Sequence, residues 1–201
     1  VAIVRDERLV YANAFGQADM EVPESARTGH RYRIASLSKA LTAAAVVKLI
    51  EEGRFELDDR VFGAGSILGN VYGVPTADVA TIEVQDLLEH TGGGWCGAGS
   101  EPGIMFTQYD LSRDELIADT LENFPLNTTP GTTYCYSNFG YSVLEAVIEA
   151  AMGGESYEDY ILDELATPAE ADSLALAGNT LADQMTDEVK YYDFFDPYFF
   201  N

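Results

Sequence analysis

The run ALTAAAVVKLI at residues 40–50 most constrains the fold of this chain, because it is apolar on nearly every side of a helix. A helix of that kind belongs in a protein interior, so the run predicts a buried helix over residues 36–52. Gly53 follows it directly and is suited to end the helix as a C-terminal cap. The sequence therefore predicts a central helix whose first turn lies deep in a cleft.

The first turn of this helix holds a serine and a lysine three positions apart, Ser36 and Lys39. Residues at i and i+3 share a helix face, so the Lys39 amine can lie beside the Ser36 hydroxyl. Unpaired backbone N–H groups at the helix start favour negative charge on the serine oxygen or on an attacked carbonyl. The spacing is typical of an activated serine. Alone it is a weak signal, since ten serines and three lysines produce it by chance in about one chain in seven.

A second polar triplet, Tyr136-Ser137-Asn138, stands between a Pro-Gly turn and another apolar helix. Each of these residues also has an ordinary structural explanation. Ser36 and Asn138 could serve as helix caps, Lys39 could be a solvated charge and Tyr136 a core aromatic. These explanations weaken together, because the helix around Lys39 is too apolar to face water and a buried ammonium needs polar partners. Ser36, Tyr136 and Asn138 would be suitable partners.

In these motifs and the segments around them, the chain resembles the serine β-lactamase and penicillin-binding superfamily, and within it the branch of class C β-lactamases, D-aminopeptidases and family VIII esterases. The resemblance rests on RIASLSK at residues 33–39, LIEEGRFELDD at 49–59, LLEHTGG at 87–93 and PGTTYCYSNFGY at 130–141. It implies an α/β (α+β) fold of the β-lactamase/transpeptidase type, an antiparallel sheet flanked by helices plus an all-helical region. This chain would hold mainly the helical part and the N-terminal hairpin.

The resemblance also implies a role for each residue of the two motifs. Ser36 would be the nucleophile that forms an acyl-enzyme, and its backbone N–H would supply half of the oxyanion hole. Lys39 would take the serine proton or hold the pKa of the serine down. Tyr136 would be the partner acid and base, protonating the leaving group and later helping to activate water. Asn138 would bind Lys39 and the acyl amide or carbonyl of the substrate.

One part of the family pattern is absent from this sequence. It is the third motif, a Lys-Thr-Gly or His-x-Gly on a sheet strand, which would also supply the second oxyanion donor. We therefore expect C-terminal strands of the same fold to pack on this chain, and both ends of the sequence look cut. The two histidines, His30 and His90, are expected to be structural, since neither is placed to act as the base in this family.

The pattern along the chain predicts a hairpin of residues 1–4 and 9–15 and helices at residues 81–90, 112–123, 138–152 and 156–166. Thr81 is expected to cap the first of these helices, and Ser112 with Glu115 has the spacing of a capping box. The expected domain organisation has four parts. They are N-terminal strands of the sheet domain at residues 1–35, the helix with the nucleophile at 36–53, a helical region at 54–170, and an incomplete return towards the sheet domain at 171–201.

The chain is strongly acidic, with 34 Asp and Glu against 11 Lys and Arg and a formal net charge of −23. Nucleic acids and anionic membranes need a basic face, so neither is an expected partner. Two interpretations stay open: adaptation to high salt, which screens self-repulsion, and an acidic surface that keeps the protein soluble. No segment has the apolar length of a membrane span and no signal peptide opens the chain, so we expect a soluble protein and leave secretion open.

Cys96 and Cys135 have neither the spacing of a metal motif nor the number that a disulfide framework requires. We expect two buried thiols, with a single disulfide as the alternative. No metal and no cofactor is expected.

Together these observations predict a serine hydrolase that acts through an acyl-enzyme on a small-molecule ester, amide or β-lactam, as a carboxylesterase or a β-lactamase-like enzyme. The alternative is a non-catalytic member or inactive fragment of the same fold, used for binding or scaffolding. A strand with the third motif further along the gene would favour the enzyme.

Overall fold

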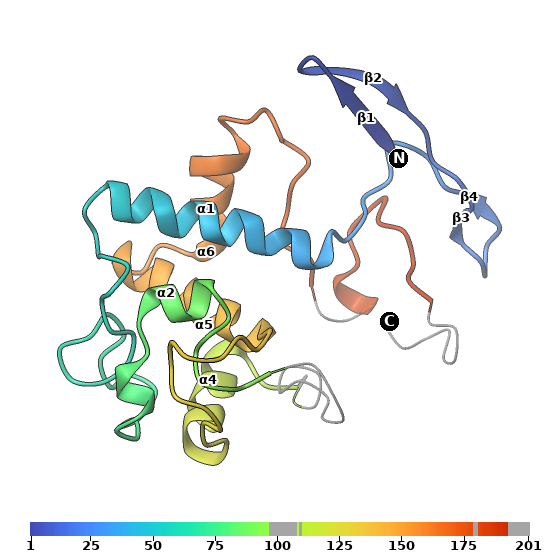
Figure 1. Cartoon of the computed structure of the whole chain (residues 1–201). Helices are drawn as coiled ribbons and strands as arrows, with labels where there is room; N and C mark the ends of the chain where they lie inside the picture. Colours follow the sequence, from blue (N-terminus) through green and yellow to red (C-terminus); the bar gives the residue numbers. More distant parts are fainter. Residues whose placement is uncertain (97–107, 109, 179–180, 193–201) are drawn as a thin grey trace. The chain divides into compact units, whose positions relative to one another are not determined.

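The computed structural model describes residues 1–96, 108, 110–178 and 181–192. The chain forms two compact units, one of residues 1–35 and 173–201 and the other of residues 36–172. Both polar motifs lie in the second unit, in which every named element of regular structure is a helix (Figure 1). The aromatic end at residues 193–201, part of the expected return towards a sheet, lies outside the described residues.

The first unit begins with an antiparallel hairpin of β1 (Ala2–Arg5) and β2 (Arg8–Ala12), which confirms the hairpin expected at the start of the chain. Asp6 and Glu7 connect the strands with positive φ angles of 51° and 62°. Two positive φ angles define a type I′ turn, whose twist matches that of paired strands. A second antiparallel pair follows, made of β3 (Gln17–Asp19) and β4 (Glu24–Ser25).

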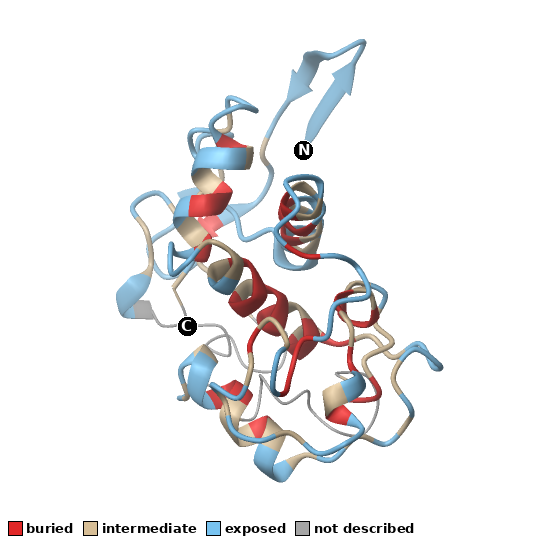
Figure 2. Cartoon of the chain, turned by 90° about the vertical axis from the view of Figure 1, so that its left-hand side faces the viewer, coloured by how far each residue is buried: buried red, intermediate tan, exposed pale blue. Residues whose placement is uncertain are grey.

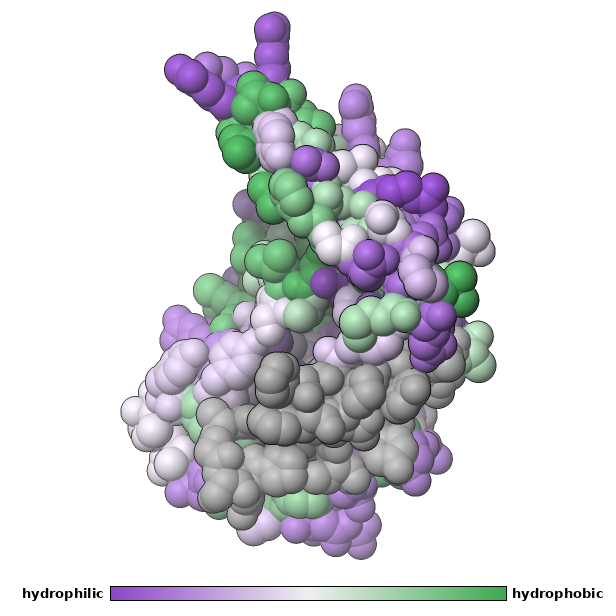
Figure 3. Space-filling model, turned by 90° about the vertical axis from the view of Figure 1, so that its right-hand side faces the viewer, coloured by the Kyte–Doolittle hydropathy of each residue, from purple (hydrophilic) through white to green (hydrophobic). Residues whose placement is uncertain are grey.

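The hairpin of β1 and β2 is exposed along its whole length in the described structure. Ile3 and Val10, for example, keep 50% and 57% of their surface accessible. Figure 3 shows hydrophobic side chains on this hairpin near the top of the view. A hairpin of two strands is marginally stable in water unless it packs on further strands or a helix. Its apolar side chains therefore lack the cover that a larger sheet would give.

The second unit packs its helices around α5 (Asn138–Ala151). Val143, Leu144, Val147 and Ile148 of this helix have no accessible surface, and α5 forms the red centre of the unit in Figure 2. The surrounding helices are α1 (Ser38–Glu51), α2 (Val84–Leu88), α4 (Arg113–Asn123) and α6 (Tyr157–Ile161), the last continued by a π-helix over Leu162–Ala166. The amphipathic α5 thus fixes the position of its own first residue, Asn138, within the unit.

The prediction that α1 is buried on all sides is wrong for the described structure. Only Thr42, Ala45, Val46 and Leu49 are buried, the i, i+3, i+4 and i+7 positions of one face. This face packs on α5 and α6, whereas Val47 on another side is 48% exposed. Apolar composition shows that a helix can be buried, but burial also requires other segments to cover it.

The helix starts follow local capping chemistry. Ser112 accepts from the backbone N–H of Glu115, whose carboxylate accepts from Ser112 N–H, so the predicted capping box of α4 is confirmed. The prediction of Thr81 as a cap is wrong, because residues Val79–Thr81 form a separate 3-10 turn. A reciprocal pair of Glu83 and Asp86 begins α2 instead.

Cys96 and Cys135 form a disulfide, with their Cα atoms 5.5 Å apart. The expectation of two buried thiols is therefore wrong. The bond joins the loop after α2 to the residue before Tyr136, across 39 positions of sequence. Chain folding brings these residues together, and their spacing in sequence does not predict this contact.

Candidate active site

Ser36 lies in the 3-10 turn Ala35–Leu37, and α1 begins two residues later at Ser38. The predicted α-helical start at Ser36 is therefore corrected to a tighter turn that leads into the helix. Leu37 occupies the N-cap position without a side-chain hydrogen bond to the first turn. The helix start thus leaves backbone N–H groups available to a negative charge, and the Ser36 side chain beside it is exposed.

The Ser36 hydroxyl contacts both an amine and a phenol. Lys39 Nζ donates to Ser36 Oγ at 3.4 Å, as the i, i+3 spacing predicts. Tyr136 OH lies 2.6 Å from Ser36 Oγ, although the two residues are 100 positions apart. A serine oxygen within hydrogen-bond reach of two groups that exchange protons is the geometry of an activated nucleophile.

Asn138 completes the contacts of the lysine. It is the first residue of α5, and its Oδ1 accepts from Lys39 Nζ at 2.7 Å. Ser137 caps this helix, because its hydroxyl accepts from Gly140 N–H at 2.9 Å and donates to the carbonyl of Trp95 at 2.9 Å. The cap explains why a polar triplet stands at this helix start. The structure thus brings together all four predicted site residues.

Lys39 also shapes the electrostatics of the site. Its Nζ lies 4.9 Å from the centre of the Tyr136 ring. The Lys39 ammonium, and after it the Ser36 hydroxyl, lower the pKa of the Tyr136 phenol below its ordinary value of 10.0, against a smaller effect of burial. A phenol with a lowered pKa ionises more readily near neutral pH, so more of it is present as the phenolate that can act as a general base.

Two residues of this region have closer contacts with the site than the sequence indicated. Tyr141 lies one turn after Asn138 on α5, with its ring centre 5.5 Å from Lys39 Nζ, and its hydroxyl donates to the carbonyl of Leu88. The i, i+3 spacing of Asn138 and Tyr141 is the signal that could have identified it. His90, expected to be structural, has its ring centre 4.5 Å from that of Tyr136.

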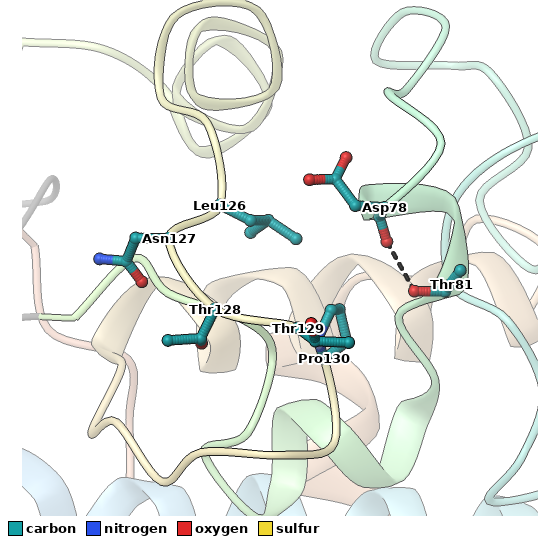
Figure 4. A pocket seen from close by; sticks show the side chains of 7 residues that line it. All are labelled: Asp78, Thr81, Leu126, Asn127, Thr128, Thr129 and Pro130. Atoms are coloured by element: carbon teal, nitrogen blue, oxygen red, sulfur yellow. Dashed lines mark hydrogen bonds between the residues drawn. The ribbon is translucent and has the colours of Figure 1, made fainter.

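A separate hollow of about 350 Å³ opens on the second unit (Figure 4). Its lining comes from Asp78 with the 3-10 turn that follows it and from the loop at residues 126–130, and in Figure 4 Asp78 and Leu126 face each other across it. The remaining lining residues are Thr81, Asn127, Thr128, Thr129 and Pro130. Because it includes none of the four site residues, this hollow is not part of the candidate active site.

Metal ligands do not gather in the part of the chain that the structure describes: no group of three or more His, Cys, Asp or Glu could hold an ion there. Within the same ranges, no helix combines the length and the apolar character needed to cross a bilayer.

The chain has a known architecture, the β-lactamase/transpeptidase-like fold, as the resemblance implied. Residues 1–192 match the family model described as Beta-lactamase. The chain therefore belongs to the beta-lactamase family, a family of serine hydrolases.

The relatives are longer than this chain. Penicillin-binding protein 4* of Bacillus subtilis (strain 168) is 28% identical over 188 residues, which cover 91% of this chain and 39% of that protein. The octameric penicillin-binding protein homologue from Pyrococcus abyssi is 27% identical with a TM-score of 0.73, covering 97% of this chain and 44% of that one. A D-stereospecific amidohydrolase from Streptomyces sp. is 29% identical with a TM-score of 0.56, covering 70% and 43%. The chain thus spans about two fifths of the length of these relatives.

Proposed function

We propose that this protein is a serine hydrolase that cleaves a small-molecule ester or amide through an acyl-enzyme on Ser36. The observation that carries the proposal is the 2.6 Å contact between Ser36 Oγ and Tyr136 OH, with Lys39 bonded to Ser36. Exposure of the Ser36 side chain supports access by a substrate. Membership of a serine hydrolase family agrees with this chemistry.

Acylation begins when Ser36 Oγ attacks the carbonyl carbon of the substrate. Tyr136 acts as the phenolate, which forms more readily because Lys39 lowers the pKa of the phenol, and it takes the Ser36 hydroxyl proton across the 2.6 Å contact. The Ser36 backbone N–H binds the oxyanion of the tetrahedral intermediate. As the bond to the leaving alcohol or amine breaks, Tyr136 returns the proton to it and the acyl group stays on Ser36.

Deacylation reverses these roles with water as the nucleophile. Tyr136 takes a proton from the water that attacks the acyl carbon and then returns it to Ser36 Oγ as the acid product leaves. Tyr136 therefore takes part in every proton transfer of the cycle and ends it as the phenolate with which it began. The Lys39 ammonium stabilises this phenolate. Asn138 holds Lys39 through Oδ1 and offers its amide N–H group to the acyl carbonyl of the substrate.

The names of the relatives favour an acyl compound as substrate. One is a penicillin-binding protein and another a D-stereospecific amidohydrolase, so β-lactams and amides join esters as candidates. We propose an esterase or a β-lactamase-like hydrolase, with no part played by nucleic acids or membranes. An acidic chain of net charge −23 would suit a secreted or high-salt environment.

The complete site is proposed to include further strands of the same fold. The relatives are more than twice as long as the matched chain, and the exposed apolar side chains of the hairpin would be covered by added strands. One of those strands would carry the third motif and the second oxyanion donor. Residues 1–201 alone would then acylate more slowly than a protein that includes those strands.

Intact-mass spectrometry after incubation with a fluorophosphonate or a penicillin tests the proposal. The parent protein should gain one adduct, and the Ser36→Ala variant should gain none. Ser38→Ala is the matched control, because it removes a hydroxyl from the same turn and should keep the adduct. An adduct that persists in Ser36→Ala would overturn the assignment.

A further inference from the structure

His90 binds the backbone on both sides of Tyr136. Its carbonyl oxygen accepts from Cys135 N–H at 2.7 Å, and its imidazole Nδ1 accepts from Ser137 N–H at 3.2 Å. Since Cys135 and Ser137 are the sequence neighbours of Tyr136, one residue holds both flanking peptide groups. Two such bonds restrict the backbone rotations that would move the tyrosine hydroxyl away from Ser36.

The imidazole also packs on the aromatic rings of the site. Its centre lies 4.5 Å from that of Tyr136 and 5.1 Å from that of Tyr141, with Tyr134 at 5.8 Å. The Lys39 ammonium contacts the rings of Tyr136 and Tyr141 as well. His90 and Lys39 therefore share two tyrosine neighbours, and a change at His90 acts directly on the surroundings of the proposed base.

We propose that His90, in its neutral form, is the positioning residue that holds the Tyr136 hydroxyl against Ser36. This inference rests on the proposed function of Tyr136 as the acid and base. An acceptor at Nδ1 requires the tautomer with its proton on Nε2. A protonated ring would turn an N–H towards the Ser137 N–H and add a cation near Lys39. We call the two His90 bonds, to Cys135 N–H and to Ser137 N–H, the clamp. The clamp opens when His90 gains a proton, because the bond to Ser137 N–H is then lost.

Burial and one nearby cation favour the neutral form of His90. Lys39 of α1 faces it, with Tyr134 and Tyr136 from the segment before α5 and Tyr141 from α5 itself. Burial, and then the positive charge of Lys39, lower the pKa of His90 below its ordinary value of 6.5. The clamp is thus closed at neutral pH and opens in acid, so acylation of Ser36 should have an acid limb that belongs to His90.

Two substitutions separate the parts of this clamp. His90→Asn keeps an oxygen acceptor for the Ser137 N–H, does not titrate, and tolerates the positive φ of 60° at this position. His90→Phe keeps an aromatic ring but has no acceptor. His30→Asn is the control, because it changes the other histidine of the chain, which lies in the other unit.

The rate of fluorophosphonate labelling at Ser36 is measured across acid and neutral pH in folded variants. His90→Asn should label at nearly the parent rate at neutral pH and lose the part of the acid limb that belongs to His90, keeping the part that comes from protonation of the Tyr136 base. His90→Phe should label about 100-fold more slowly, the effect of misplacing a catalytic group by about 1 Å. His30→Asn should keep the parent profile. An acid limb unchanged in His90→Asn, or an unchanged rate in His90→Phe, would overturn the inference.

A second readout needs no activity. The pKa of Tyr136, followed by NMR of labelled tyrosine, should move up towards 10 in His90→Phe, because the phenol loses its fixed contact with Lys39. If Ser36 is never labelled but this pKa moves, the proposed function fails and the positioning role stands. If Ser36 is labelled and neither the profile nor the pKa responds, the function stands and the positioning role fails.

Discussion

Ser36 Oγ lies 2.6 Å from Tyr136 OH, across 100 positions of sequence. Lys39 links this pair to α5, since its ammonium bonds Ser36 at 3.4 Å and Asn138 at 2.7 Å. The segments that begin α1 and α5 thus meet around the Ser36 hydroxyl. This relationship connects the packing of the helical unit with the reactivity proposed for Ser36.

Lys39→Met should leave a folded protein in which acylation of Ser36 is slower by about 10²- to 10⁴-fold, the usual contribution of acid and base catalysis. The physical reason is that Tyr136 loses the neighbouring charge that lowers its pKa. Fluorophosphonate labelling rates measure the effect. Lys48→Met on the same helix is the control, because that lysine pairs with Glu52 and Glu164. Equal rates in Lys39→Met and the parent would contradict the role of Lys39.

Glu145→Gln should stabilise the protein at pH 8. Burial first of all raises the pKa of Glu145 to about 7 from 4.5, with Arg113 opposing and Glu149 adding to the shift. Between these two pH values the folded state binds a proton that the unfolded state releases. The protein therefore has its full stability with respect to Glu145 below pH 4.5, and it loses part of that stability as pH rises to about 7. The variant avoids that loss.

Urea unfolding of parent and Glu145→Gln at several pH values measures this difference. The gain should reach about 3 kcal/mol at pH 8, since one pKa unit corresponds to about 1.4 kcal/mol. It should shrink towards acid pH. Glu122→Gln, on the exposed side of α4, is the matched control variant. A gain that is constant with pH would refute the linkage to Glu145.

Removal of the Cys96–Cys135 disulfide should destabilise the second unit. A bond across 39 residues restricts the unfolded chain, and the loop-entropy relation assigns it about 4 kcal/mol. Urea unfolding with and without dithiothreitol gives the loss, and the double Cys→Ser variant should no longer respond to the reductant. Identical midpoints for the parent under both conditions would argue against this contribution.

Added sodium chloride should raise the melting temperature. A net charge of −23 repels itself in dilute buffer, and the screening length falls from about 10 Å at 0.1 M salt to about 3 Å at 1 M. Chloride is preferred to sulfate in this test, because sulfate stabilises proteins by exclusion from their surface. A melting temperature that stays constant up to 1 M would exclude the interpretation of salt adaptation.

Local chemistry was predictable from the sequence. The i, i+3 spacing of Ser36 and Lys39 predicts their contact, and the spacing of Ser112 and Glu115 predicts a capping box that the structure contains. In both cases the interacting groups are fewer than five positions apart. Helix geometry alone fixes such distances.

Contacts made by distant segments were less predictable. The exposed side of α1 depends on what covers the helix, and the bond of Cys96 with Cys135 depends on how two loops meet. The clamp of His90 on the Tyr136 segment uses backbone N–H groups. Every residue except proline has such a group, so the residue types do not reveal which ones bind His90. These features follow from tertiary packing.

The central claim is that Ser36 is the residue that becomes acylated, and peptide mapping of the labelled protein tests it most directly. The parent is treated with a fluorophosphonate, digested, and sequenced by tandem mass spectrometry. We predict a single phosphonyl group on Ser36. A label on Ser38 or on any other residue, with Ser36 unmodified, would contradict the account.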